Sequence, residues 1–228
     1  LGTTNSCVAV YYGSPRNGYP IVIPNQDTGK QTTPSVVAYT DKDILIGEAA
    51  QNQALTNPLN TYYSTKRLLG NALTEKQAKK LAYKVDFESA ADSRIIRPDG
   101  TKMEAPQVIA HLYRKMKEYV QLHTGIDMIN AVITVPAYFS DTQKGNMRIA
   151  AEVAGIRVRR ILSEPTAAAM AYGFGALGVK SKKKLTITEG KVLVFDLGGG
   201  TFDSSILSLD AGVYEVLATS GDSALGGD

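Results

Sequence analysis

The architecture of this chain follows from Lys191-Val-Leu-Val-Phe-Asp196-Leu-Gly198-Gly199-Gly200-Thr201-Phe-Asp203-Ser-Ser-Ile206-Leu207. The apolar run at its start is rich in β-forming residues, and three consecutive glycines follow it. This pattern predicts a strand, a tight turn and a second strand. Glycines also let a backbone approach a ligand closely and point its amides at that ligand.

Polar groups on both sides of this turn favour a phosphate ligand. Asp196 ends an apolar strand, where a carboxylate is costly unless a charge accompanies it. Thr201 adds a hydroxyl and Asp203 a second carboxylate. Carboxylates, amides and a hydroxyl on one hairpin suit a magnesium-bound polyphosphate. The structural alternative is an ordinary glycine hairpin with an acidic tip, and the flanking Asp and Thr residues favour phosphate binding over it.

The first residues repeat this pattern. Leu1-Gly2-Thr3-Thr4 precedes a predicted strand, as Leu197-Gly198-Gly199-Gly200-Thr201 does. Two such turns, far apart in the sequence, predict two similar lobes that face a shared ligand. Chance similarity of two hairpins is the alternative.

Composition excludes several classes of protein. The 228 residues are 43% hydrophobic and 21% charged, as in ordinary globular proteins, and a net charge of +3 is too weak to indicate a nucleic-acid binder. The basic run at residues 182–184 has no interleaved aromatic residues and is interpreted as a solvated loop. A single cysteine, Cys7, excludes an internal disulfide framework. No apolar run reaches the ~18 residues that a membrane helix needs. We therefore expect neither a nucleic acid nor a membrane as partner.

The spacing of apolar residues, together with glycine, proline and capping residues, predicts the remaining helices and strands. Apolar residues at helical spacing follow Pro106, and Gly125 ends that helix. A β-α-β pattern then covers strand 130–136, a helix capped by Ser140 or Asp141 and ended by Gly155, and strand 157–162. A helix from Glu164 to Tyr172 and a strand at 213–219 come next, and a charged helix is predicted at 74–83. His111 and His123 share no ligand spacing and are interpreted as structural or surface residues.

Seven motifs carry a resemblance to a known family. They are Leu1-Gly-Thr-Thr-Asn-Ser6, Thr32-Thr33-Pro34-Ser35, Lys66-Arg67-Leu-Leu-Gly70, Val135-Pro136-Ala-Tyr-Phe139, Glu164-Pro165-Thr166-Ala-Ala-Ala169, Asp196-Leu-Gly-Gly-Gly-Thr-Phe-Asp203 and Gly221-Asp222-x-x-Leu225-Gly226-Gly227. In this order and over the whole chain they resemble the 70-kilodalton heat-shock chaperones. Residues 5–10 look more like the bacterial and mitochondrial branch.

The resemblance implies an α/β protein with the actin-like ATPase fold. In that fold each lobe is a ribonuclease-H-like mixed sheet flanked by helices. We expect residues 1–175 to form the first lobe and residues 176–228 to begin the second. The family's adenosine-binding part and its peptide-binding domain would lie beyond residue 228, so the isolated fragment is expected to be inactive.

The resemblance also implies roles for single residues in binding and hydrolysing ATP. Asp196 and Glu164 would hold Mg²⁺ through water, and Asp203 would bind K⁺ or assist the attacking water. Lys66 would stabilise charge on the γ-phosphate, although a Lys-Arg pair on its own is typical of a solvated helix end. Phosphate would contact Thr3, Thr4, Gly198, Gly199, Gly200 and Thr201.

Further implications concern coupling and partners. Pro136 resembles a proline that relays nucleotide state between the lobes, and Lys144 stands where the family has the arginine that contacts it. Arg160 and Asp210 resemble a surface for a J-domain co-chaperone. The main surface for a nucleotide exchange factor would lie outside these residues, and unfolded polypeptides would bind the C-terminal domain. Cytoplasm or mitochondrial matrix is the expected location, with the endoplasmic reticulum as an alternative.

Three departures keep other functions open. The family's Gly-Ile-Asp, which includes a magnesium-directing carboxylate, does not precede Leu1. Lys144 cannot make the planar bidentate contact of an arginine. The sequence also ends before the rest of the second lobe. A nucleotide-binding sensor without turnover, or an actin-like or sugar-kinase relative, is therefore the alternative to the chaperone ATPase.

Overall fold

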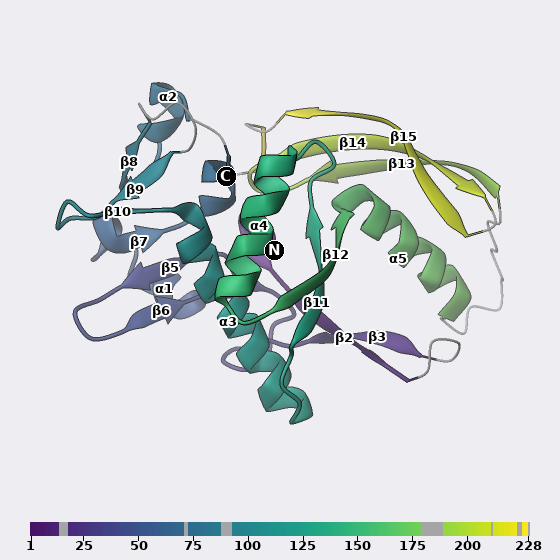
Figure 1. Ribbon diagram of the computed structural model, residues 1–228, viewed down its shortest axis with the longest axis horizontal. Coiled ribbons are helices and arrows are strands. Elements are labelled where there is room, and N and C mark those ends of the chain that lie inside the picture. Colours follow the sequence, from purple (N-terminus) through teal and green to yellow (C-terminus); the bar gives the residue numbers. More distant parts are fainter. Residues whose placement is uncertain are drawn as a thin grey trace. The chain divides into compact units, whose positions relative to one another are not determined.

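The computed structural model describes residues 1–13, 18–70, 73–87, 93–178, 189–210, 212–222 and 225–227. The basic run at 182–184 lies outside these residues. Two compact units are present (Figure 1): one comprises Leu1–Ala131 and Ser140–Arg159, and the other comprises Val132–Phe139 and Arg160–Asp228. These units divide the chain differently from the lobes expected from the sequence, whose boundary stays a prediction.

The first unit contains short antiparallel strands in several small sheets. β1 (Asn5–Ser6) pairs with β4 (Thr33–Pro34), and β2 (Val8–Tyr12) pairs with β3 (Tyr19–Ile23). A second group has the order β6-β5-β7, from Ile44–Ile46, Val37–Tyr39 and Thr61–Tyr62. A third has the order β10-β9-β8, from Lys102–Met103, Arg94–Ile96 and Lys84–Asp86. Each sheet is too small to be stable alone, so it depends on packing against helices.

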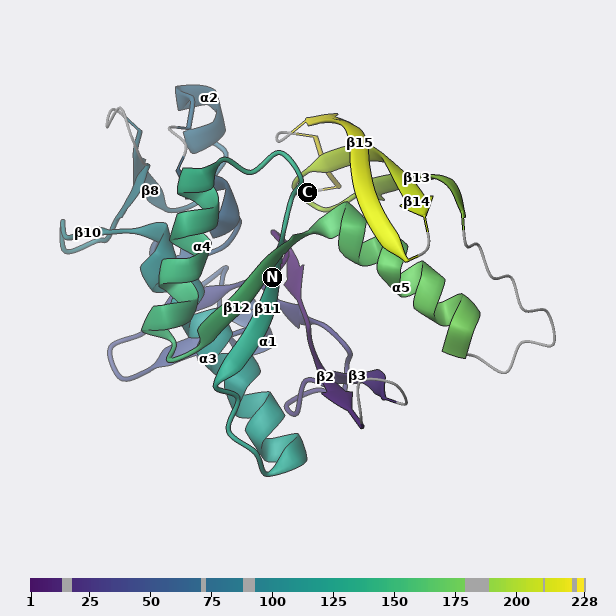
Figure 2. The same ribbon diagram turned by 45° about the vertical axis from the view of Figure 1, so that its right-hand side comes forward.

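The helices of the first unit supply that packing. The short ones are α1 (Glu48–Asn52), η1 (Pro58–Asn60), η2 (Thr65–Leu68) and α2 (Glu75–Ala78). The long ones are α3 (Ala105–Thr124) and α4 (Asp141–Val153), which lie side by side (Figure 2).

Helix α3 forms where its sequence predicts it. Glu104 and Gln107 make a reciprocal capping box, and Gly125 ends the helix in the left-handed conformation with φ of 72°. The predicted apolar stripe is buried, namely Val108, Ile109, Leu112, Met116, Tyr119 and Val120. Burying one such large side chain contributes roughly 1.5–3 kcal/mol, which anchors α3 in the core. Ser140 rather than Asp141 caps α4, in a capping box with Gln143.

The predicted charged helix at 74–83 is wrong beyond its first turn. Only Glu75–Ala78 is helical, because Tyr83 is instead drawn into the core. Its ring meets those of Tyr62 and Tyr63 edge-on at 5.2 and 5.5 Å, and its hydroxyl donates to the Tyr63 carbonyl at 2.6 Å. Aromatic packing over a sequence distance of twenty residues outweighs the weak local preference for a helix.

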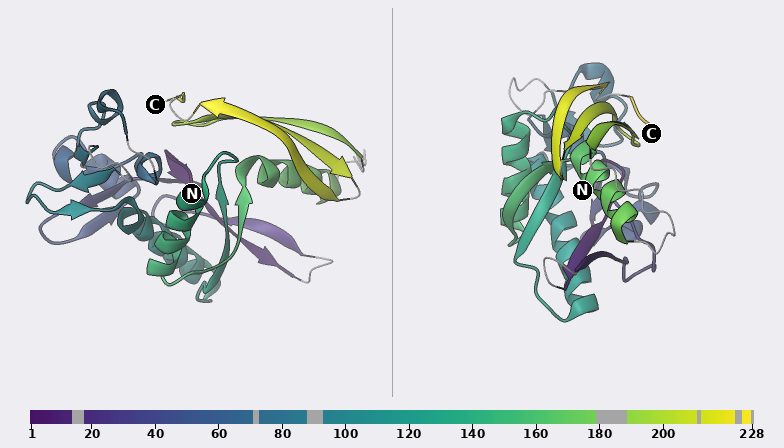
Figure 3. Two further views of the ribbon diagram at one scale, coloured as in Figure 1. Left: turned by 45° about the horizontal axis from the view of Figure 1, so that its top comes forward. Right: turned by 90° about the vertical axis from the view of Figure 1, so that its right-hand side faces the viewer.

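The second unit is a three-stranded antiparallel sheet with a helix packed against it (Figure 3). Its strands are β13 (Glu189–Leu197), β14 (Phe202–Asp210) and β15 (Val213–Asp222), and its helix is α5 (Glu164–Gly178). α5 continues past Tyr172, where the sequence predicted its end, because glycine lowers helix stability by only about 1 kcal/mol. β15 likewise runs beyond the predicted residue 219.

Two strands run from one unit into the other. β11 (Asn130–Val135) and β12 (Arg157–Ser163) are neighbours in a two-stranded sheet, as the predicted β-α-β pattern requires. In the described part of the chain, no helix is long and apolar enough to cross a membrane.

Candidate functional site

The glycine turn of the second unit is a closed four-residue loop. β13 and β14 pair along their whole length, with Leu197 opposite Phe202, so Gly198 to Thr201 join them. The Gly198 amide donates to the Thr201 carbonyl at 2.9 Å. The register also brings Asp196 opposite Asp203, directly below the loop. The strand-turn-strand expectation is therefore confirmed, and it gathers both predicted carboxylates beside the predicted amide cradle.

A second glycine segment packs directly on this loop. The Gly227 amide donates to the Gly198 carbonyl at 3.1 Å. A side chain on Gly226 would put its Cβ 2.1 Å from the Gly199 carbonyl oxygen and 2.6 Å from the Gly200 nitrogen. Two backbones thus meet at a distance that only glycine allows. The close contact explains why position 226 requires glycine.

The three carboxylates that the sequence assigned to cation binding all belong to this unit. Asp203 is buried with 2% exposure, and Asp196 and Glu164 are half-buried. Glu164 is the first residue of α5, the helix that packs against the sheet. Within the described residues, no group of three or more acidic, His or Cys side chains is close enough to hold a metal directly.

The first unit holds the other predicted turn, residues 2–5. The Gly2 amide donates to the Asn5 carbonyl at 3.1 Å, and a Cβ on Gly2 would lie 2.3 Å from that oxygen. Glycine is therefore required for the turn to close. Thr3 and Thr4 lie inside the turn and are half-buried.

A serine from a distant segment holds this turn, and sequence reasoning missed it. Ser35 donates its backbone amide to the Thr4 carbonyl at 2.8 Å and its hydroxyl to the Gly2 carbonyl at 2.8 Å. The Ser6 and Ser35 hydroxyls are also 2.8 Å apart. The Thr32-Thr33-Pro34-Ser35 motif was visible in the sequence, but no local signal joined it to Gly2, 33 residues away.

Lys66 is buried in the same unit, with 5% exposure, so it is not the solvated helix end that its neighbour Arg67 suggested. It lies on the 3₁₀ turn η2, which follows Ser64 in the left-handed conformation with φ of 53°. A positive φ is uncommon for a residue other than glycine. Lys66 Nζ donates to the Leu1 carbonyl at 2.9 Å, beside the turn of residues 2–5.

The residues assigned to coupling and to partners lie in separate parts of the structure. Lys144 is on α4 of the first unit, with its Nζ 3.3 Å from Asp141 Oδ1 of the same helix. Pro136 is buried, directly after β11, and belongs to the second unit. Arg160 on β12 and Asp210 at the end of β14 are both exposed.

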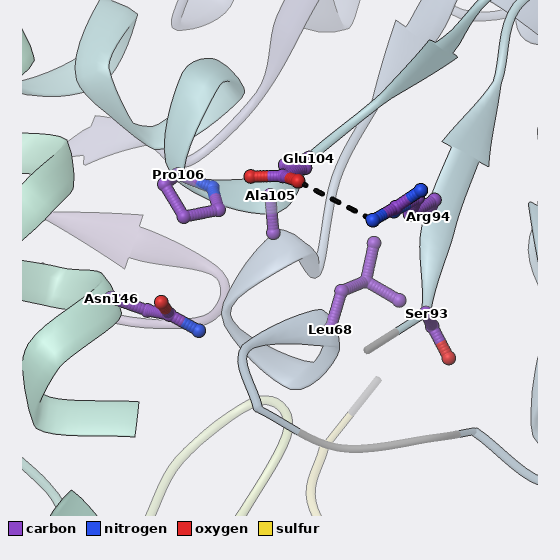
Figure 4. A pocket seen from close by; sticks show the side chains of 7 residues that line it. All are labelled: Leu68, Ser93, Arg94, Glu104, Ala105, Pro106 and Asn146. Carbon is purple, nitrogen blue, oxygen red and sulfur yellow. Dashed lines mark ion pairs between the residues drawn. The ribbon is translucent and has the colours of Figure 1, made fainter. Parts of the chain in front are cut away.

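A small cavity in the first unit does not serve as a nucleotide site. It lies between Leu68, Pro106 and Asn146, with the Arg94–Glu104 ion pair of 3.7 Å at its edge (Figure 4). Its volume of about 20 Å³ accommodates a single water molecule.

The architecture is mixed α/β, and each unit places a glycine turn with a threonine hydroxyl at the end of a strand. The family model for Hsp70 protein matches residues 1–228. The chaperone protein dnaK of Cyanidioschyzon merolae is 48% identical over 232 residues, which cover all of this chain and 36% of that relative.

The chain belongs to the Hsp70 family. It spans about a third of the length of the curated relative that it matches. Family membership confirms the resemblance drawn from the seven motifs, and it confirms the fold class, because the N-terminal ATPase domain of this family has the actin-like fold. The roles assigned to single residues stay predictions.

Proposed function

We propose that this chain is the nucleotide-binding domain of a molecular chaperone that hydrolyses ATP to control its hold on unfolded polypeptides. The observation that carries the proposal is the match to the Hsp70 family over all 228 residues. The packing of Gly226 against the Gly198–Thr201 loop supports it, since the two backbones meet at a distance that leaves no room for a side chain at Gly226. Neither observation favours the sensor or the sugar-kinase alternative over the chaperone.

In this proposal the two glycine turns bind phosphates. Gly198, Gly199 and Gly200 offer backbone amides, and Thr201, Thr3 and Thr4 offer hydroxyls. Oriented donors of this kind stabilise the charge of a transferring phosphoryl group because they need no reorganisation during the reaction. Lys66 adds a positive charge that burial makes more effective than it would be in water.

The carboxylates fit a cation held through its water shell. Asp196 and Asp203 face each other across one hairpin, and Glu164 opens the helix packed on that sheet. Two or three such groups suit a hydrated Mg²⁺, which keeps several waters when it binds proteins. Mg²⁺ would neutralise phosphate charge when bound. Asp203 would position the attacking water or take part in binding K⁺.

Membership of the family suggests the kinds of partner that this protein binds. We propose that Arg160 and Asp210, both exposed, contribute to a J-domain co-chaperone surface, and that Pro136 and Lys144 relay nucleotide state. A nucleotide exchange factor and unfolded polypeptides would bind mainly through parts of the protein outside these residues. The similarity to a dnaK chaperone supports the cytoplasm or an organelle matrix as the location.

Turnover assays on the full-length protein separate the three functions. ATP hydrolysis that rises when a J-domain protein and an unfolded peptide are added supports the chaperone. Transfer of phosphate to a sugar would instead support the kinase. Binding of ATP without either reaction would support the sensor.

A further inference from the structure

Three carbonyl groups in and beside the first glycine turn accept hydrogen bonds from distant segments. The Leu1 carbonyl accepts from Lys66 Nζ at 2.9 Å, and the Gly2 carbonyl accepts from Ser35 Oγ at 2.8 Å. The Thr4 carbonyl accepts from the Ser35 amide at 2.8 Å. Ser35 therefore supplies two of the three donors, one from its side chain and one from its backbone.

Holding these carbonyls determines where the amides point. A trans peptide unit is planar, so its C=O and the N–H of the next residue point in opposite directions. No described peptide bond here is cis. The hydrogen bond from Ser35 Oγ to the Gly2 oxygen therefore turns the Thr3 amide the other way. A carbonyl that swung towards a phosphate would repel it, whereas an amide there attracts it.

The hydroxyl of Ser35 has one hydrogen, which it donates to the Gly2 carbonyl. The bond between Ser6 and Ser35 must therefore have Ser6 as its donor. Both side chains are buried, with exposures of 2% for Ser6 and 4% for Ser35. Water consequently has little access to replace a lost partner. Of the two hydrogen bonds of the Ser35 hydroxyl, only the one to the Gly2 carbonyl reaches the turn.

We propose that Ser35 is a positioning residue for nucleotide phosphates, which it serves by orienting the Gly2–Thr4 turn without touching the ligand. The inference deepens the proposed nucleotide-binding function and rests on it. It predicts a defect specific to the phosphate part of a nucleotide, because the adenosine part does not depend on the orientation of this turn.

The test compares ADP and adenosine binding by calorimetry in full-length protein. Ser35→Ala leaves the Gly2 oxygen without its hydroxyl donor, so ADP affinity should fall about tenfold, the scale of one lost buried hydrogen bond. Adenosine affinity should stay unchanged. Ser35→Thr keeps the hydroxyl and should restore ADP binding.

Ser6→Ala is the matched control, because it removes a buried hydroxyl of the same cluster but leaves the Ser35–Gly2 bond in place. It should lower the melting temperature to a similar extent and leave ADP affinity unchanged. If Ser35→Ala does not fold, Ser35→Cys keeps the volume with a weak donor and should show a severalfold loss for ADP alone.

Two results would overturn the inference: equal losses for ADP and adenosine, or ADP affinities that match in the Ser35 and Ser6 variants. A wild-type protein that binds ADP but never hydrolyses ATP would remove the proposed ATPase function and leave the role of Ser35 standing. A wild-type protein that binds no ADP would overturn both.

Discussion

Lys66 Nζ lies 2.9 Å from the carbonyl oxygen of Leu1 and donates a hydrogen bond to it. The two residues are 65 positions apart, and the lysine is almost fully buried. Burying an ammonium group is costly unless polar partners compensate it. This arrangement therefore places a positive charge next to the Gly2–Thr4 turn, where the Leu1 carbonyl compensates part of the cost of burying it.

Replacing Lys66 by alanine should reduce ATP hydrolysis far more than ATP binding. A group that stabilises charge mainly in the transition state lowers turnover, and removing one such donor typically costs ~2–4 kcal/mol. Single-turnover hydrolysis and ATP titration measure the two effects separately. Lys79→Ala is the control, since Lys79 is exposed and its ion pair with Glu75 lies at the surface. Near-normal single-turnover rates in Lys66→Ala would remove Lys66 from the mechanism.

Replacing Gly226 by alanine should distort the Gly198–Thr201 loop. The new Cβ would meet backbone atoms of Gly199 and Gly200, which cannot rotate away as a side chain can. Overpacking of this kind costs roughly 1–3 kcal/mol of stability, and we expect ADP affinity to fall as well.

Gly227→Ala is a control one residue away, because a Cβ at Gly227 would meet nothing within 4 Å. Thermal unfolding and ADP titration should leave this variant close to wild type. Equal behaviour of the Gly226 and Gly227 variants would show that the close contact has no influence on the loop.

His111 should make stability depend on pH. Its pKa is lowered, first by burial and second by the Arg114 guanidinium, whose Nη1 lies 3.5 Å from Nδ1. The folded state therefore binds fewer protons than the unfolded state near pH 6. The contribution of neutral His111 to the free energy of unfolding should be fully present above the ordinary histidine pKa of about 6.5. It should be lost as the pH falls towards the lower pKa of the folded state.

Melting temperatures at pH 5.5 and 7.5 test this expectation. His111→Gln should flatten the difference between the two values, although the loss of the 3.0 Å contact between Nε2 and the Tyr39 hydroxyl lowers both. His123→Gln, at an exposed position, should keep the wild-type difference. An unchanged slope in the His111 variant would assign the pH dependence to other groups.

Lys144→Arg should strengthen the coupling between ATP binding and peptide release, if Lys144 takes part in the relay. A guanidinium offers a planar fork to carbonyl oxygens, whereas an ammonium is a point charge. The present partner, Asp141, is fully exposed, and such surface pairs contribute about 0–1 kcal/mol, so little holds Lys144 in place. Stopped-flow peptide release on addition of ATP measures the effect, with Lys79→Arg as control. Equal release rates would assign no coupling role to the position.

Local patterns in the sequence predicted much of the fold. The apolar stripe of α3, its end at Gly125, the N-cap of α4 and the glycine turn between β13 and β14 all lie where the sequence indicated them. These features depend on interactions between residues a few positions apart, namely helical periodicity, capping and backbone freedom at glycine. The motifs at both turns likewise identified the family before any contact was known.

Contacts between distant segments could not be found in this way. Ser35 reaches Gly2 across 33 residues, Lys66 reaches Leu1 across 65, and Gly226 meets Gly199 only because β15 returns along β14. The predicted helix at 74–83 was wrong for the same reason, since Tyr83 packs on rings that no local pattern anticipates. The sequence determined the strands, helices and turns through short-range preferences. Tertiary structure alone decided which distant residues hold the two glycine turns, because packing selects those pairs from many that local chemistry allows equally.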